Sequence, residues 1–232
     1  MNSIKKTERV AGLWYLLTAI TSPFGLIYVP NQLIVPGEPT VTANNIMASE
    51  ILFRLGIVSI LIGQISFIFL ALALNRLLKD VDENYAKLMV SLVIVAVSIA
   101  FINELTQIAV LHLLSGANYL KVFKPDQLNA LAMTFLNLHE QGISVVGFFW
   151  GLWLFPFGYL VIKSKFIPKV LGILLIIGCF AYLVQSTIAL LFPIYNGIVA
   201  VMLILPLAAG EISMILWLLL NGLRVRRPAA NM

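Results

Sequence analysis

The sequence predicts an all-α membrane protein, a bundle of six transmembrane helices with both termini in the cytoplasm. Of its 232 residues, 61% are hydrophobic and 11% charged, whereas soluble domains are about 45–50% apolar and about 25% charged. Its apolar runs are long enough to cross a hydrocarbon core of about 30 Å. Basic residues gather in alternate connections between these runs. The length suits one membrane domain, residues 1–232, with no separate soluble part.

The first predicted span, residues 10–29, follows a short basic segment. It is longer than the roughly 7–15 apolar residues of a signal peptide and lacks a small-residue cleavage motif, so we interpret it as a retained helix. Pro23 and Gly25 predict a kink near its outer end. Residues 30–49 are rich in Pro, Gly and Asn, which predicts a loop. The second span is predicted at residues 50–74.

The other connections differ in character. Residues 75–87 have mixed charge, which is typical of a solvated turn. In the long connection 115–136, Pro125 and Asp126 predict the start of a short interfacial helix that runs into the fourth span, because proline suits a first turn and an acid suits the helix dipole. The remaining spans are predicted at residues 88–114, 137–162, 168–192 and 197–220.

The distribution of basic residues predicts the topology. Of the 15 Lys and Arg residues, 12 lie in the N-terminal segment, the second and fourth connections and the C-terminal segment, which holds Arg224, Arg226 and Arg227. The positive-inside rule then places both termini in the cytoplasm of a multi-pass inner (plasma) membrane protein. The net charge of +5 fits topology and contact with membrane lipids better than nucleic acid. Aromatic residues near span ends are expected in interfacial belts: Trp14, Tyr15, Trp153, Tyr159 and Trp217.

Ionisable side chains within the spans are the candidates for a functional pocket. Each costs about 2.5–3.5 kcal/mol at membrane depth and therefore rarely faces lipid. The predicted spans contain the carboxyl groups of Glu50, Glu104, Glu140 and Glu211 against the single cation of Arg54. If the four acids converge, repulsion and desolvation forbid four anions, so some must be protonated or must hold a cation.

The second and third spans each present polar groups on one face. Glu50 and Arg54 have i, i+4 spacing, which predicts either an ion pair at the outer headgroup level or a positive charge at the mouth of a pocket. Asn103, Glu104 and Gln107 share one arc of the third span. They are expected to face the bundle, as interhelical hydrogen-bonding groups or as pocket residues.

The fourth span places Glu140 on the face of Gly147 and Gly151, small residues that suit close helix packing. Glu140 is therefore expected to point into the bundle, with His139 about 100° away around the helix. These two residues do not belong to an H-E-x-x-H motif, so a zinc protease is not indicated. Nucleotide-binding, thiol-redox and hydrolase motifs are also absent from the sequence. Neither a metal nor a cofactor is predicted, and no enzyme class is indicated.

The last two spans add two candidates. Gln185 lies in the fifth span, and Glu211 follows Pro206 in the sixth. Proline removes a backbone hydrogen bond, which is tolerated in a membrane only beside protein or a water-filled cavity. Glu211 lies about 22 Å from the outer end of its span at 1.5 Å per residue, near the middle of the membrane.

Short motifs along the chain resemble a bacterial membrane family known as domain of unknown function 4386. The resemblance extends over about residues 9–222 and rests on Leu33-Ile34-Val35-Pro36-Gly37, Ala43-Asn44-Asn45-Ile46, Phe53-Arg54-Leu55-Gly56, Leu114-Ser115-Gly116-Ala117-Asn118-Tyr119, Asn137-Leu138-His139, Gly158-Tyr159-Leu160, residues 168–172, Gly210-Glu211 and Leu216-Trp217-Leu218. It implies a six-span inner-membrane protein without an assigned activity. It also implies that Arg54, His139 and Glu211 are the positions the family's pattern picks out, whereas Glu104 and Glu140 match none of its motifs.

Three functional hypotheses follow. The first is a polar pocket in the outer half of the bundle, open to the outer side, that binds or moves a small solute or proton. Arg54, His139 and Glu211 would line it, with Glu104 and Glu140 as further members. The second is an intramembrane enzyme acting on lipid through His139 and Glu140. The third is a structural or regulatory subunit whose polar groups only join helices.

Overall fold

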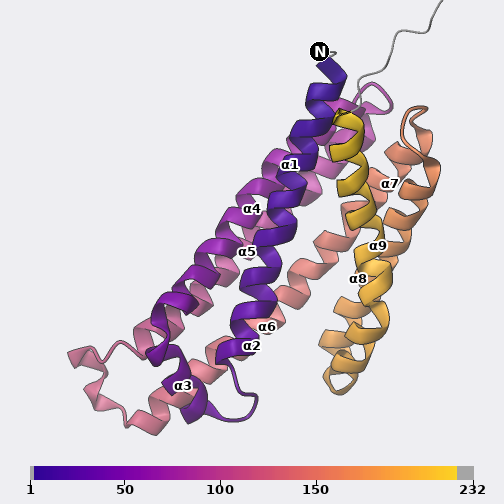
Figure 1. The fold of residues 1–232 in the computed structure, drawn as a ribbon. Helices are drawn as coiled ribbons and strands as arrows, with labels where there is room; N and C mark the ends of the chain where they lie inside the picture. Colours follow the sequence, from indigo (N-terminus) through magenta and orange to yellow (C-terminus); the bar gives the residue numbers. More distant parts are fainter. Residues whose placement is uncertain (1–2, 224–232) are drawn as a thin grey trace, which may run out of the picture.

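The computed structural model describes residues 3–223, which form a bundle of membrane-length helices (Figure 1). Among these residues, 6 helical stretches are long and apolar enough to cross a membrane: Lys5–Leu33, Glu50–Leu78, Glu83–Leu113, Pro125–Lys163, Lys169–Leu191 and Pro193–Leu220. The described chain has no β-strand. The predicted fold class, an all-α bundle of six membrane helices, is therefore confirmed. Arg224, Arg226 and Arg227 lie outside the described residues.

The first span is one irregular helix, made of α1 (Ser3–Pro23), the π-helical turn η1 (Phe24–Tyr28) and α2 (Val29–Leu33). Because Pro23 has no backbone N–H group, it cannot donate a regular α-helical hydrogen bond, and the π-helical turn η1 follows directly after it. The span therefore continues beyond the predicted end at residue 29. At Gly25 a Cβ atom would lie 2.6 Å from the Gly56 carbonyl oxygen, so this glycine permits the close approach of the first two spans.

The prediction of a loop over residues 30–49 is wrong, because half of this segment forms α3 (Pro39–Ala48) and its first residues complete α2. Proline stands at the first helical position, where its missing N–H is not needed. Ile46 is buried on the inner face of α3. The Asn45 side-chain amide donates to the Leu33 carbonyl at 3.2 Å and ties α3 to the end of α2. Residues that resembled turn formers thus begin a helix or join it to its neighbour.

The next two helices, α4 (Glu50–Leu78) and α5 (Glu83–Leu113), extend into the segment that was predicted to be a mixed-charge turn. The Asp82 carboxylate caps α5 by accepting a hydrogen bond from the Tyr85 backbone N–H at 3.3 Å. Lys163 Nζ also donates to Asp82, at 2.8 Å. Charged residues can occupy solvated helical turns beyond the membrane, so apolar runs alone gave spans that were too short.

After the short helix η2 (Asn118–Val122), the chain forms α6 (Pro125–Leu152) and α7 (Leu154–Lys163). The helix predicted to start at Pro125 exists and, as expected, runs without interruption into the fourth span. The span breaks instead at Trp153. Pro156 causes this interruption, since it offers no N–H to the carbonyl group of Leu152.

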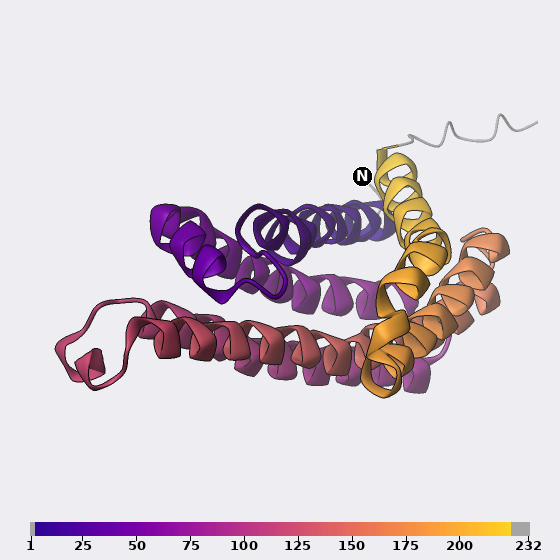
Figure 2. The same ribbon diagram turned by 90° about the horizontal axis from the view of Figure 1, so that it is seen from below.

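The described part of the chain ends with α8 (Lys169–Leu191), the short helix η3 (Pro193–Tyr195) and α9 (Asn196–Leu223). Helices α5 and α6 lie side by side along most of their lengths (Figure 2). Helices α1 and α9 are close near the N-terminal end of the bundle and diverge towards the other end (Figures 1 and 2). This divergence leaves the first half of α9 with little cover from the rest of the bundle: Val201 is 74% exposed.

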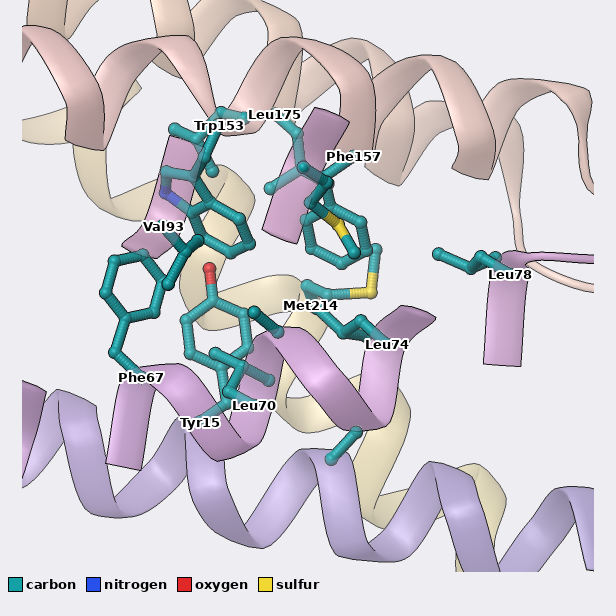
Figure 3. Close-up of a cluster of buried hydrophobic side chains, with 14 of the residues drawn as sticks. Tyr15, Phe67, Leu70, Leu74, Leu78, Val93, Trp153, Phe157, Leu175 and Met214 are labelled. Carbon is teal, nitrogen blue, oxygen red and sulfur yellow. The ribbon is translucent and has the colours of Figure 1, made fainter. Parts of the chain in front are cut away.

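The main hydrophobic core surrounds the break between α6 and α7 (Figure 3). Trp153 packs edge-on against Phe67, with 4.9 Å between ring centroids, and stacks on Phe157 at 5.3 Å. Tyr15 reaches into the same cluster from α1, and its ring lies 6.1 Å from that of Trp153. The expectation that Tyr15 and Trp153 belong to interfacial belts is therefore wrong, since both are 2% exposed and lie inside the bundle.

The N-terminal end of the bundle gathers the basic connections. Thr7 of α1, Arg76 of α4 and Lys163 and Lys165 of the α7–α8 turn line one surface hollow there. The N-terminal segment and the second and fourth connections thus lie at the same end. This is the alternation that six spans require.

Candidate functional site

A cavity of about 390 Å³ lies between α1, α4, α6, α8 and α9, beside the aromatic core. Glu211 is the only Asp, Glu, Lys, Arg or His residue among the described residues that line it. Small-molecule pockets commonly measure about 300–1,000 Å³ and are mostly apolar with few polar groups. Both its size and its lining make this cavity the candidate site.

Glu211 is fixed at the cavity wall by two tyrosines from different helices. Tyr15 of α1 donates its hydroxyl hydrogen to Glu211 Oε2 at 2.8 Å. Tyr182 of α8 donates to Glu211 Oε1 at 3.1 Å. Each carboxyl oxygen therefore has its own donor, and an ionised carboxylate can accept both bonds at once. The site joins three spans through one acidic side chain.

Gln64 of α4 is the second polar group of interest in the cavity wall. It is only 2% exposed, and its side-chain oxygen has no hydrogen-bond partner within the described part of the chain. A buried polar atom without a partner costs about 1–3 kcal/mol. Gln64 lies about 21 Å from the start of α4, and Glu211 about 22 Å from the start of α9, so both are near mid-span.

The two helices that diverge at the cavity each contain an internal proline. Pro23 ends α1, and Pro206 lies within α9. Such interruptions are tolerated in membrane helices where protein or a cavity is adjacent. The rim between these helices carries exposed apolar side chains: Ile27 is 58% and Ile204 62% exposed. In a membrane, these rim residues would meet lipid chains.

A second polar cluster lies between α5 and α6, apart from the cavity. Glu104 is 1% exposed, and its Oε1 lies 3.0 Å from His139 Nε2. Asn103 donates its side-chain amide to the His139 backbone oxygen at 3.0 Å. Gln107 Nε2 lies 2.9 Å from His139 Nε2. Three candidate residues of the third span thus surround one histidine of the fourth.

The state of His139 decides which of these contacts is a hydrogen bond. A protonated Nε2 donates to Glu104, whereas an unprotonated Nε2 accepts from Gln107. Glu104 Oε2 is buried and has no hydrogen-bond partner among the described residues. Neither Glu104 nor His139 lines the cavity at Glu211. The cluster joins two packed helices, α5 and α6, outside the cavity at Glu211.

Two other candidates form an exposed ion pair. Arg54 and Glu50 are joined at 2.7 Å, with their side chains 57% and 53% exposed. Neither residue lines the cavity at Glu211. The structure therefore separates Arg54 from His139 and Glu211, the two residues with which it was grouped, because the pair lies at the first turn of α4.

The expectation that Glu140 points into the bundle is wrong, because its side chain is exposed. Glu140 shares the face of α6 that carries Gly147 and Gly151, but this face is buried only at the two glycines and not at Glu140. Gln185 is half-buried on α8 and does not line the cavity. Within residues 3–223, three or more His, Cys, Asp or Glu side chains nowhere gather closely enough to hold a metal ion.

Sequence reasoning missed Tyr15 and Tyr182 as functional residues. Tyr15 lies five residues after the predicted start of the first span at residue 10, or about 7.5 Å along the helix, which fits an interfacial position and gave no signal of a site. Tyr182 is aligned with Gly178 on α8, but nothing in the sequence indicates which acid it meets. Only tertiary contact brings it to Glu211.

Comparison with known proteins adds one finding. A family profile described as Domain of unknown function (DUF4386) matches residues 10–222, which is most of the chain. No curated protein matches the sequence. No solved structure matches it either.

Proposed function

We propose that this chain, which belongs to the DUF4386 family, binds a small, largely apolar solute of the membrane in the cavity at Glu211. The observation that carries the proposal is a cavity of about 390 Å³ whose mainly apolar wall presents one carboxyl group. An apolar wall favours a solute that already partitions into lipid. The carboxyl group and Gln64 orient it, as the few polar groups of a small-molecule site do.

The solute reaches this site from the side, between α1 and α9. Support comes from the rim, where Ile27, Ile204 and Ile212 combine contact with the cavity and more than half of their surface exposed. A solute dissolved among lipid chains would pass these side chains without crossing a polar barrier. We therefore propose a site that opens to the bilayer, and the pocket open to the outer aqueous side stays an untested prediction.

Tryptophan fluorescence provides the test, because Trp150 and Trp153 line the cavity. In a Trp14→Phe/Trp217→Phe background, these are the remaining tryptophans. The neutral probe 4-bromoneopentylbenzene carries bromine, which quenches tryptophan emission on contact. We expect saturable quenching in the purified protein.

Two variants of α9 make this test specific. Ala208→Phe fills the cavity and should abolish saturable quenching. Val201→Phe adds the same ring at a position that is 74% exposed, and should leave quenching unchanged. Quenching that never saturates, or that survives Ala208→Phe, would contradict the proposed site.

The alternative of a lipid-acting enzyme at His139 and Glu140 has less support. His139 contacts Glu104, while the side chain of Glu140 is exposed and points about 100° away around α6. The alternative of polar groups that only join helices fits the cluster around His139. It does not explain the cavity at Glu211.

We also propose that both termini lie in the cytoplasm and that the protein resides in the inner (plasma) membrane. The basic end of the bundle supports this orientation, because positively charged connections remain inside. In a Cys179→Ala background, a membrane-impermeant maleimide applied to intact cells should label Tyr119→Cys but not Lys165→Cys. The reverse labelling would invert the topology.

A further inference from the structure

The cavity at Glu211 has a chemical character beyond its apolar nature. Five aromatic side chains line it together with the carboxyl group: Tyr15, Phe67, Trp150, Trp153 and Tyr182. They come from α1, α4, α8 and the region where α6 meets α7. A group of aromatic rings attracts a cation through the negative faces of the rings, most strongly where water is excluded. We infer that the solute of the proposed site is a lipophilic organic cation, held by these rings and by the carboxylate of Glu211.

The electrostatics of the wall support a positively charged solute. A lone carboxylate in an apolar membrane cavity is costly unless it is paired. The groups facing Glu211 that could titrate are Tyr15 and Tyr182, and both already donate to it. The remaining described lining residues from α1, α4, α6 and α9 carry no ionisable side chain. The counter-charge must therefore come from a proton or from the solute.

The hydrogen-bond acceptors of the cavity wall indicate which class of cation fits the site. Both oxygens of Glu211 already accept a hydroxyl group, and Gln64 adds one side-chain oxygen without a partner, so the wall offers charge and ring faces more than a shell of oxygen ligands. Hard metal cations require a shell of about six or more oxygen ligands. A quaternary or tertiary ammonium group requires none, and its apolar substituents match the wall. The solute therefore exchanges with a proton on Glu211.

This inference rests on the proposed function and can fail separately from it. The probe is 4-bromobenzyltrimethylammonium, whose neutral carbon isostere is 4-bromoneopentylbenzene. The two differ in charge but hardly in shape. In the two-tryptophan background, we expect the cation to bind at least about tenfold more tightly than the isostere, a difference within the range of desolvated cation–π contacts.

Substitution of the carboxyl group should remove this preference. In Glu211→Gln, the cation and the isostere should bind within about twofold of each other, and retained isostere binding shows that the variant is folded. Glu50→Gln, a matched loss of one exposed carboxyl group, should keep the preference. In weakly buffered solution, binding of the cation should release about one proton in the parent protein and none in Glu211→Gln.

The outcomes separate the two proposals. If the isostere binds as tightly as the cation, or if Glu211→Gln keeps the preference, the cation inference is overturned while a solute site remains. If proton release persists in Glu211→Gln, the exchange at Glu211 is overturned. If neither probe quenches saturably, both proposals fail.

Discussion

Two carboxyl groups within membrane spans, Glu104 and Glu211, occupy opposite kinds of environment. Both meet hydrogen-bonding groups from neighbouring helices. Glu104 is 1% exposed between α5 and α6, where its partner is the ring of His139. Glu211 faces a cavity of about 390 Å³ and accepts from two tyrosines. A membrane-embedded acid is therefore not by itself evidence of a site, because the space around it decides.

The spacing between the helix backbones explains why the surroundings of Glu104 and Glu211 differ. At Gly142 of α6, a Cβ atom would clash with the Asn103 side chain, so this glycine lets α6 approach α5 until no room remains. At Glu211 the neighbouring helices diverge, and Pro23 and Pro206 interrupt their regular hydrogen bonding. The same polar chemistry thus serves as an interhelical joint in one place and as a binding group in the other.

The largest expected effect tests how closely α5 and α6 pack at the cluster around His139. Gly142→Ala should lower the free energy of unfolding in mixed micelles by about 1–3 kcal/mol, because Asn103 must move and release the His139 carbonyl. Gly197→Ala is the control, since a Cβ there meets nothing within 4 Å. Equal stability of the two variants would show that the α5–α6 contact is looser than described.

A double-mutant cycle between Glu104→Ala and His139→Ala measures the joint directly. We expect a coupling free energy of about 1–2 kcal/mol, near the upper range for hydrogen bonds between membrane helices. Solute binding at Glu211 should be unchanged in both single variants, because neither residue lines the cavity. Additive effects on stability would show that Glu104 and His139 do not interact. Loss of binding in either variant would show that this cluster is coupled to the cavity at Glu211.

The tyrosines at Glu211 should show the converse pattern. Tyr15→Phe and Tyr182→Phe retain the ring but lose the hydroxyl donor. Each should weaken binding of 4-bromobenzyltrimethylammonium by about threefold to tenfold, since one hydrogen bond contributes about 0.5–1.5 kcal/mol. Titration by fluorescence quenching gives the affinities. Unchanged affinity in both variants would mean that neither hydroxyl prepares Glu211 for its solute.

The smallest effect concerns an acid outside the membrane, Asp82. The hydrogen bond from Lys163, followed by that from the Tyr85 backbone N–H, lowers the pKa of Asp82 below its ordinary value. A lowered folded-state pKa stabilises the protein above the unfolded value of about 3.9, and this contribution disappears as the pH falls through the folded-state pKa.

Unfolding measured across about pH 3–6 should therefore show a weaker acid dependence in Asp82→Asn than in the parent protein. The difference should be small because Lys163 is half-exposed and surface ion pairs contribute little. Identical pH profiles would remove Asp82 as a contributor to acid stability. A larger change in the free energy of unfolding than for Gly142→Ala would show that the α4–α5 connection, and not the contact between α5 and α6, limits stability.

The sequence was sufficient for the number of spans, because hydropathy and charge are properties of single segments. It also placed Asn103, Glu104 and Gln107 on one inward arc, which the structure turns towards His139. It failed for α3, since Pro39 begins a helix as readily as it forms a turn. It failed for Glu140 because small residues on one face of a helix do not tell how far along the helix that face is covered by a neighbour.

The pairing between helices was beyond sequence reasoning. Grouping Arg54, His139 and Glu211 assumed that polar residues in the spans share one pocket. Their separation depends on how α4, α6 and α9 are arranged in the bundle, which local periodicity does not encode. Tyr15 and Tyr182 became site residues only when three helices met at Glu211.

The most direct test of the central contrast is the reaction of the two acids with dicyclohexylcarbodiimide. This lipid-soluble reagent adds to protonated carboxyl groups that are accessible from the membrane, and peptide mass spectrometry locates the resulting N-acylurea. We expect modification of Glu211, protection by 4-bromobenzyltrimethylammonium, and no modification of Glu104. Equal labelling of both residues, or labelling of Glu104 alone, would contradict an open site at Glu211 and a sealed joint at Glu104.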